Sequence, residues 1–332
     1  MPFPLLNLPR VAYEEVLYNY SVPDLVDFSL LSSRCHRIIQ SIRFPFTGVH
    51  VGVANYGGTL RCANSKWPAD QWVFVKNPWR NLERKNEMRK IGGIDIRIIK
   101  LPFWRSVHEP GIQLKVVCDY LCDLFRLPIT GFSFKDSNQE LFPQAFGIIK
   151  CEELYLKSSS EIPVDELKYV LEKVRISNTL VLDLKKNEDF ECGFVQFSMD
   201  ELTINRAFWI TNETFLAMDC ARIVLEGNGN LPIRKFVSQW LLSKNKRFEW
   251  LKMTWNNERI NWNKVFETMQ WNPDIRGRNF KINSKRRVDC ENGIDILRDD
   301  GLLATIIERN QQIYFLVWHK RFQPETDHLQ ID

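Results

Sequence analysis

The sequence of 332 residues predicts an α+β or α/β protein that begins with a small helical module and continues into strands. Three observations support this fold class. Apolar residues recur at helical spacing up to residue 43, alternating apolar and polar residues follow up to residue 110, and short strands then alternate with helices. We expect segments at 1–43, 44–110, 111–290 and 291–321, and a frayed tail at 322–332.

The composition excludes several classes of protein. Hydrophobic residues make up 44% and charged residues 26% of the chain, which is ordinary for a globular protein with a substantial core. The formal net charge of +4 is too small to indicate nucleic acid or an anionic membrane by itself. A secretory signal and a membrane span are not expected, because neither a signal-type apolar region nor a stretch of about 18 apolar residues occurs.

The eight cysteines are scattered, and none forms a C-x-x-C pair. Metal sites usually need such pairs or histidines at set distances, so we expect no metal site. Scattered cysteines indicate buried free thiols in a reducing compartment, and therefore an intracellular protein.

Three short helices are predicted between residues 8 and 43. Leu8-Pro9 precedes the first, in which Ala12, Val16 and Tyr20 repeat at helical spacing. Ser21 can cap the second, and a stripe from Cys35 to Ile42 predicts the third. Helices this short are near the limit of independent stability, so they should rest on a partner or on the remaining chain.

This stretch resembles the F-box, the helical motif that docks on the Skp-type adaptor of SCF ubiquitin ligases. The resemblance is to the large nematode group of F-box proteins. It is carried by Phe3-Pro4-Leu5-Leu6, Leu8-Pro9, Val16-Leu17, Pro23-Asp24-Leu25, Ser29-Leu30, Ser32-Ser33-Arg34 and Ile38-Ile39. The residues that it places against the adaptor are Leu5, Leu8, Pro9, Leu17, Leu25 and Leu30. From the pattern alone, a small helical cap on the chain's own core would be the better interpretation, because helical apolar stripes usually face a core, and the Leu8-Pro9 start and the Ser-x-x-Arg spacing favour the F-box instead.

The segment 44–110 is predicted to be rich in strands. Residues 47–63 alternate and then turn at 55–58, which is typical of a β-hairpin. Two more strands are expected at 71–75 and 93–104. The charged stretch 77–90 between them predicts a solvated loop or helix.

Short strands of the pattern apolar-x-apolar recur at intervals of about 20 to 30 residues from 112 to 283. Helical stripes lie between most of them, clearest at 167–174, 233–240 and 262–269, and a further helix is expected near 114–125. The apolar pairs are Phe132/Phe134, Leu154/Leu156, Leu180/Leu182, Leu202/Ile204, Ile223/Leu225, Leu251/Met253 and Phe280/Ile282. This period is typical of a degenerate leucine-rich-repeat-like solenoid, and an ordinary α/β sheet is the alternative.

In either case the residue in the middle of each apolar-x-apolar pattern faces away from the helices, and so does the residue that follows the pattern. A stacked sheet of this kind offers a wide open face on which a partner protein can bind. The residues that we expect to bind a target protein there are Ser133, Tyr155, Thr203, Asn205, Glu226 and Lys252. Residues 198–227 also resemble the nematode F-box-associated domain of the second type, which implies a substrate receptor without catalytic residues.

The tail is predicted to form a hairpin of strands Ala304–Ile307 and Ile313–Trp318. We expect this hairpin to pair with the sheet formed by residues 46–104, which would bring both ends of the chain together.

No pattern of an active site is found in the sequence. The five histidines lack paired metal-ligand spacing, and neither a phosphate-binding loop nor a nucleophile elbow occurs. We therefore expect no enzyme, cofactor or metal, and a substrate-recognition subunit of an SCF-type ubiquitin ligase with an adaptor, a cullin and an unknown target as partners. The alternative is a nucleic-acid-binding protein that uses the basic loop 276–287, with Lys285, Arg286 and Arg287.

Overall fold

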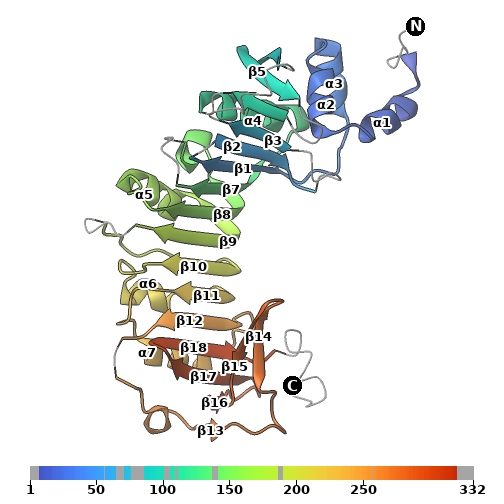
Figure 1. Cartoon of the computed structure of the whole chain (residues 1–332). Helices are drawn as coiled ribbons and strands as arrows, with labels where there is room; N and C mark the ends of the chain where they lie inside the picture. The colour runs from blue at the N-terminus through green and yellow to red at the C-terminus, as the bar shows by residue number, and fades with distance from the viewer. Residues whose placement is uncertain are drawn as a thin grey trace. The chain divides into compact units, whose positions relative to one another are not determined.

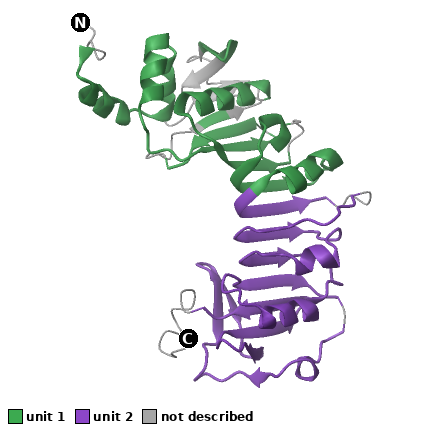
Figure 2. Cartoon of the chain, turned by 180° about the vertical axis from the view of Figure 1, so that it is seen from behind, with its two compact units in different colours: residues 1–175 green, residues 176–332 purple. Residues whose placement is uncertain are grey.

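The computed structural model describes residues 7–319, except for 56, 65–70, 76–85, 101–104, 109–110, 137–140, 186–189 and 257. The chain forms two compact units, residues 1–175 and 176–332, which Figure 2 colours separately. The segment borders expected at residues 43, 110 and 290 lie inside these units.

The first unit opens with the three predicted helices, α1 (Arg10–Tyr18), α2 (Val22–Ser29) and α3 (Ser33–Ser41). The Oγ atoms of Ser21 and Ser32 accept hydrogen bonds from the backbone N–H groups of Asp24 and Cys35 and so cap α2 and α3. Each helix is kept short, because a capping serine begins the next one within a few residues. The three-helix prediction is confirmed.

The three helices rest on the remaining part of the first unit. Their main support is α4 (Ile112–Phe125), where the Tyr120 hydroxyl lies 2.7 Å from Ser29 Oγ. Phe44 and Phe46, which follow α3, pack edge-on against Phe125 at the end of α4. The expectation that so small a module leans on the rest of the chain is therefore met.

The sheet of the first unit has the strand order β8-β7-β1-β2-β3-β6-β5-β4. Its strands are β1 (Val49–Ala54), β2 (Gly57–Cys62), β3 (Gln71–Val75), β4 (Asn86–Ile91), β5 (Ile94–Lys100), β6 (Arg105–His108), β7 (Ile129–Lys135) and β8 (Lys150–Ser158). β1 and β2 form the predicted hairpin, and β7 pairs in parallel with both β1 and β8. The prediction of a loop or helix at 77–90 is wrong for residues 86–90, because they pair with β5, and residues 77–85 lie outside the described residues.

Helices cover one face of the strands in the first unit. Besides α4, the unit contains the 3-10 turn η3 (Pro143–Phe146) after β7 and α5 (Val164–Lys173) after β8. Leu114 of α4 lies against Gly58 of β2, where an added Cβ would come within 2.7 Å of the leucine side chain. The small residue therefore lets the helix sit close to the sheet.

The sheet of the second unit has the strand order β13-β16-β17-β18-β12-β11-β10-β9. Its strands are β9 (Arg175–Leu184), β10 (Glu201–Asn205), β11 (Arg222–Leu225), β12 (Trp250–Thr254), β13 (Met269–Gln270), β16 (Ile294–Leu297), β17 (Leu303–Arg309) and β18 (Gln312–Val317). The first four are parallel neighbours, as the repeating pattern predicts, and all their apolar-x-apolar pairs are buried. The last four run antiparallel to their neighbours.

Different elements cover the two faces of this sheet. Helices α6 (Asn212–Leu216) and α7 (Ile233–Leu242) lie on one face, and a hairpin of β14 (Asn279–Asn283) and β15 (Arg286–Asp289) lies across the other (Figures 1 and 2). Phe280 and Val288 of the hairpin share a buried cluster with Trp250, Tyr314 and Leu316. Strands β17 and β18 are therefore covered on both sides, which explains why they are nearly continuous apolar runs.

Three predictions for the second unit are wrong. The strand at 280–282 does not join the parallel row, because β14 pairs only with β15. The expected helix at 262–269 is reduced to the 3-10 turn η4 (Trp262–Lys264), whose predicted cap Asn261 makes no capping bond through its side chain. The tail hairpin pairs with β12 instead of the sheet of residues 46–104, since β12 offers it an edge of unpaired backbone groups and Phe315 stacks on Phe248.

Candidate functional site

The residues expected to bind the adaptor divide by burial. Leu17 and Leu25 are fully buried in the core beneath the three helices, so their side chains are not available to a partner in this structure. Leu8 and Leu30 are half-buried and Pro9 is exposed, whereas Leu5 lies outside the described residues. The F-box resemblance singled out Leu17 and Leu25 as adaptor-binding residues, and in the structure their side chains instead hold the three helices together.

Other apolar side chains of the three helices face solvent. Val11 at the start of α1 and Leu31 after α2 are each 73% exposed, and Tyr20 is 37% exposed. These side chains are available to a partner, unlike those of Leu17 and Leu25. The F-box resemblance did not include Val11 or Leu31 among the adaptor-binding residues.

The residues expected to bind a target occupy two separate places, one in each unit. Ser133 and Tyr155 are aligned neighbours on β7 and β8 and line a hollow of about 230 Å³ in the first unit. Thr203, Asn205, Glu226 and Lys252 line a groove of about 580 Å³ in the second unit. We call the first site the hollow and the second site the groove.

Two aligned rows of side chains form the hollow. One row is Arg61, His50, Gly131 and Glu153, and the other is Thr59, Gly52, Ser133 and Tyr155. A Cβ on Gly131 would come within 2.8 Å of the His50 ring, and one on Gly52 within 2.5 Å of Thr59 Oγ1. The two glycines therefore leave the space into which their neighbours lean.

His50 is the titratable group at the centre of the hollow. Burial lowers its pKa below the ordinary value of histidine, and the positive charge of Arg61 lowers it further. The carboxylate of Glu153 acts in the opposite direction with a smaller effect. The imidazole is therefore held neutral at neutral pH.

The floor of the groove also consists of aligned rows. Glu201, Arg222 and Trp250 face each other across β10, β11 and β12, and the second row is Thr203, Val224 and Lys252. Ion pairs neutralise most of its charges. Lys252 Nζ lies 2.6 Å from Glu226 Oε1, and Arg222 lies 3.4 Å from Glu249 and 3.9 Å from Glu201.

The hairpin β14–β15 forms one wall of the groove through Ile282, Asn283 and Arg286. A buried network holds its base to the sheet. Arg276 Nε lies 2.9 Å from both carboxylate oxygens of Asp295 on β16, and an Arg276 terminal nitrogen donates to the carbonyl of Cys290 at 2.9 Å. Arg276 therefore ties the segment before β14 to Cys290, which follows β15, and to strand β16.

A second ion pair lies at the surface of the hairpin base. The guanidinium of Arg278 donates two hydrogen bonds to Asp289 and lies 2.8 Å from Glu291. These bonds lower the pKa of Asp289 to about 2. The basic loop proposed to bind nucleic acid therefore has two cations, Arg276 and Arg278, that carboxylates already neutralise, and this alternative is not favoured.

Lys285 and Arg286 at the tip of the hairpin remain available. Asn283 Oδ1 accepts hydrogen bonds from both of their backbone N–H groups at 2.9 Å, which fixes the turn. Within the part of the chain that the structure describes, neither side chain forms an ion pair or hydrogen bond. Sequence reasoning singled out these cations but could not place them beside Thr203 and Glu226.

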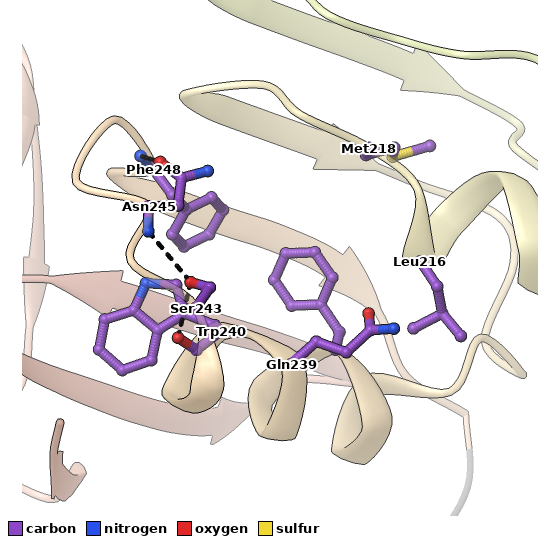
Figure 3. Close-up of a pocket in the computed structure, with 8 residues that line it drawn as sticks. Leu216, Met218, Gln239, Trp240, Ser243, Asn245 and Phe248 are labelled. Atoms are coloured by element: carbon purple, nitrogen blue, oxygen red, sulfur yellow. Dashed lines mark hydrogen bonds between the residues drawn. The ribbon is translucent and has the colours of Figure 1, made fainter. Parts of the chain in front are cut away.

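A third cavity, of about 230 Å³, lies on the helix side of the second unit (Figure 3). Its lining is mainly apolar, with Phe236 and Trp240 of α7, Phe248 and Met218 around it. Ser243 Oγ donates to the Trp240 carbonyl at 2.9 Å and accepts from the Asn245 backbone N–H, whereas the buried Trp240 Nε1 has no hydrogen-bond partner among the described residues. None of the predicted site residues lies here.

None of the eight cysteines forms a disulfide, as predicted, and six of them are buried. Burial raises the pKa of Cys151 to about 12 and that of Cys220 to about 11, so neither is a reactive thiolate at neutral pH. The described residues contain no group of three or more histidine, cysteine, aspartate or glutamate side chains placed to hold a metal ion. Among them, no helix has the length and apolar character needed to cross a membrane.

Residues 5–47 match the F-box domain, which is the segment of α1, α2 and α3. The uncharacterized protein F59B2.8 of Caenorhabditis elegans is 25% identical over 356 residues, covering 99% of this chain and 80% of that protein. The uncharacterized protein F59B2.9 of the same organism is 22% identical over 360 residues, covering 99% and 82%. No solved structure matches the chain. The chain thus carries an F-box domain and is similar along nearly its whole length to nematode proteins.

Proposed function

We propose that the chain is the substrate-recognition subunit of an SCF-type ubiquitin ligase. The F-box domain at residues 5–47 carries this proposal, because an F-box is the module through which such subunits dock on a Skp-type adaptor and its cullin. In this role the chain performs no bond chemistry, needs no cofactor and acts inside the cell.

The exposed apolar side chains of the three helices are the proposed adaptor surface. Val11 and Leu31 are the most exposed, and Leu8, Pro9 and Leu30 lie beside them in sequence. Leu5 is assigned to the same surface by the F-box pattern alone. Leu17 and Leu25 serve it indirectly, since truncating a buried leucine costs about 2–5 kcal/mol and would loosen the helices.

The proposed target surface is the side of each unit's sheet that lies opposite the helices. The parallel apolar-x-apolar strands of each unit support a degenerate leucine-rich-repeat-like arrangement, and the resemblance of residues 198–227 to the nematode F-box-associated domain of the second type fits the same role. Ser133 and Tyr155 would contact a target in the hollow, and Thr203, Asn205, Glu226 and Lys252 in the groove.

Recovery of a cullin by the immobilised full chain, with and without purified Skp-type adaptor, tests the receptor role. We expect cullin recovery only when the adaptor is present. The double variant Val11→Glu/Leu31→Glu should abolish it, because two carboxylates would be buried without partners. Leu242→Glu is the matched control, since Leu242 is 89% exposed on α7 of the second unit. Adaptor-independent recovery, or equal loss in the control, would refute the proposal.

A further inference from the structure

We propose that the groove of the second unit binds an extended acidic segment of a partner protein, held between β10–β12 and the β14–β15 hairpin. The inference rests on the proposed receptor role only for the statement that this partner is the target. The binding itself is argued from the shape, the polar groups and the charge of the groove.

The shape of the groove suits a peptide. Its volume of about 580 Å³ lies within the range of about 300–1,000 Å³ that is usual for ligand sites. The sheet supplies the floor and the hairpin supplies a wall, so the site lies between two β elements. A chain in extended conformation is the occupant that such a space accepts with the least distortion.

The groove is also preformed. The Arg276–Asp295 pair and the packing of Phe280 and Val288 hold the hairpin base against the sheet. A partner therefore does not have to order the wall before it binds, which reduces the entropic cost of association.

The lining offers both kinds of contact that an extended segment needs. Val224 and Ile282 supply most of the apolar part of the lining, against which alternate side chains of the segment can pack. Thr203 and Asn205 are half-buried, and their side chains make no hydrogen bond within the described part of the chain. They can therefore bond to the peptide backbone.

Charge decides which segment fits. Lys252 is neutralised by Glu226, and Arg222 by Glu249 and Glu201, so these cations have little field left for a ligand. Arg286 lines the groove and has no ion-pair partner among the described residues, and Lys285 lies next to it at the exposed tip. Two carboxylates, Glu249 and Glu201, face the single guanidinium of Arg222, so the floor carries no free positive charge. The cations Arg286 and Lys285 lie on the wall, where acidic side chains of a segment on the floor can reach them.

A nucleic acid fits the same groove less well. Trp250 is the aromatic side chain of the lining, and it is 6% exposed, so it offers no face on which a base could stack.

The probe for the test is a fluorescently labelled peptide of about ten residues that alternates glutamate and valine, with a lysine–valine peptide as its charge-reversed counterpart. Fluorescence anisotropy of the purified full chain should show saturable binding of the glutamate peptide and much weaker binding of the lysine peptide. The double variant Lys285→Glu/Arg286→Glu should raise the dissociation constant of the glutamate peptide by at least about tenfold. The control Arg234→Glu/Lys235→Glu, two exposed cations of α7 on the other face, should change it by less than about twofold.

Three results would overturn the proposal. One is a dissociation constant above about 1 mM for the glutamate peptide. Another is equal loss of binding in the two charge-reversal variants. The third is preferential binding of a labelled single-stranded oligonucleotide that is lost in Lys285→Glu/Arg286→Glu, which would assign the groove to nucleic acid.

Adaptor binding, measured on the same preparations, separates the two proposals. If the chain binds the adaptor but not the glutamate peptide, the groove inference is wrong and the receptor role stands. If the chain binds the peptide as expected but not the adaptor, the groove is a binding site in a protein that is no ligase subunit.

Discussion

The hollow of the first unit and the groove of the second lie over strands with the same alternating pattern, yet they are built in opposite ways. The hollow exists because two side chains are absent, at Gly52 and Gly131. The groove exists because an element is added, the β14–β15 hairpin that stands over β12. An alternating pattern thus predicts which side chains face away from the helices, but what lies above them depends on other parts of the chain.

The two sites also treat charge differently. In the hollow, an arginine and a glutamate flank a histidine that burial keeps neutral. In the groove, the charges on the floor are paired, and the wall carries the free ones. The hollow should therefore respond to pH, whereas the groove should respond to ionic strength.

Loss of the hairpin anchor would break the groove and should have the largest effect. Arg276→Ala leaves Asp295 buried without its ion-pair partner, so the free energy of unfolding of the second unit should fall by about 3–5 kcal/mol. Urea unfolding followed by tryptophan fluorescence measures this, since Trp318 lies against Arg276. Arg286→Ala is the control and should stay within about 0.5 kcal/mol. A loss below about 1 kcal/mol in Arg276→Ala would show that the network does not anchor the hairpin.

Filling the hollow should have a smaller effect. Gly131→Ala places a Cβ within 2.8 Å of the His50 ring and should destabilise the first unit by about 1–3 kcal/mol. Thermal unfolding measures the change. His50→Ala should restore part of the loss in the double variant, because the ring that causes the clash is gone. Gly193→Ala, which meets no atom within 4 Å, is the matched control. Additive effects of Gly131→Ala and His50→Ala would contradict this account of the hollow.

The smallest expected effect is a pH dependence from His50. Burial lowers the folded pKa of this histidine, so at mildly acidic pH the unfolded chain binds more protons than the folded one. The stability of the wild type should therefore increase more than that of His50→Gln as the pH is raised through about 6.5, the unfolded value. Urea unfolding at several pH values gives the difference between the two proteins. A wild type that gains stability on acidification relative to His50→Gln would contradict a lowered pKa of His50 in the folded chain.

The parts of the fold that sequence reasoning predicted depend on local patterns. Ser21 caps the second helix as predicted, and the apolar-x-apolar pairs of the parallel strands are all buried. The hairpin of β1 and β2 followed from alternation and a glycine turn. In each case neighbouring residues in the chain determine the structure.

The parts that it missed depend on contacts between distant segments. Phe280 and Ile282 have the strand pattern, but the pattern does not say whether their strand joins the parallel strands of the sheet or lies across its face. The ion pair between Arg276 and Asp295, which are distant in sequence, holds β14 and β15 across the face. The tail hairpin has the correct strands, yet its partner β12 is set by which sheet edge is free. The buried positions Leu17 and Leu25 were likewise expected at a protein interface, because the F-box resemblance does not distinguish side chains that bind a partner from those that pack the helices together.

Titration of the purified chain with purified Skp-type adaptor tests the central claim, that the three N-terminal helices dock on an adaptor, most directly. We expect a saturable one-to-one complex for the wild type and for Leu242→Glu. Binding should be lost in Val11→Glu/Leu31→Glu and weakened in Leu8→Ala/Pro9→Ala, with the thermal unfolding of all variants unchanged. A folded wild type that does not bind the adaptor would contradict the claim and show that these helices only cap the chain's own core.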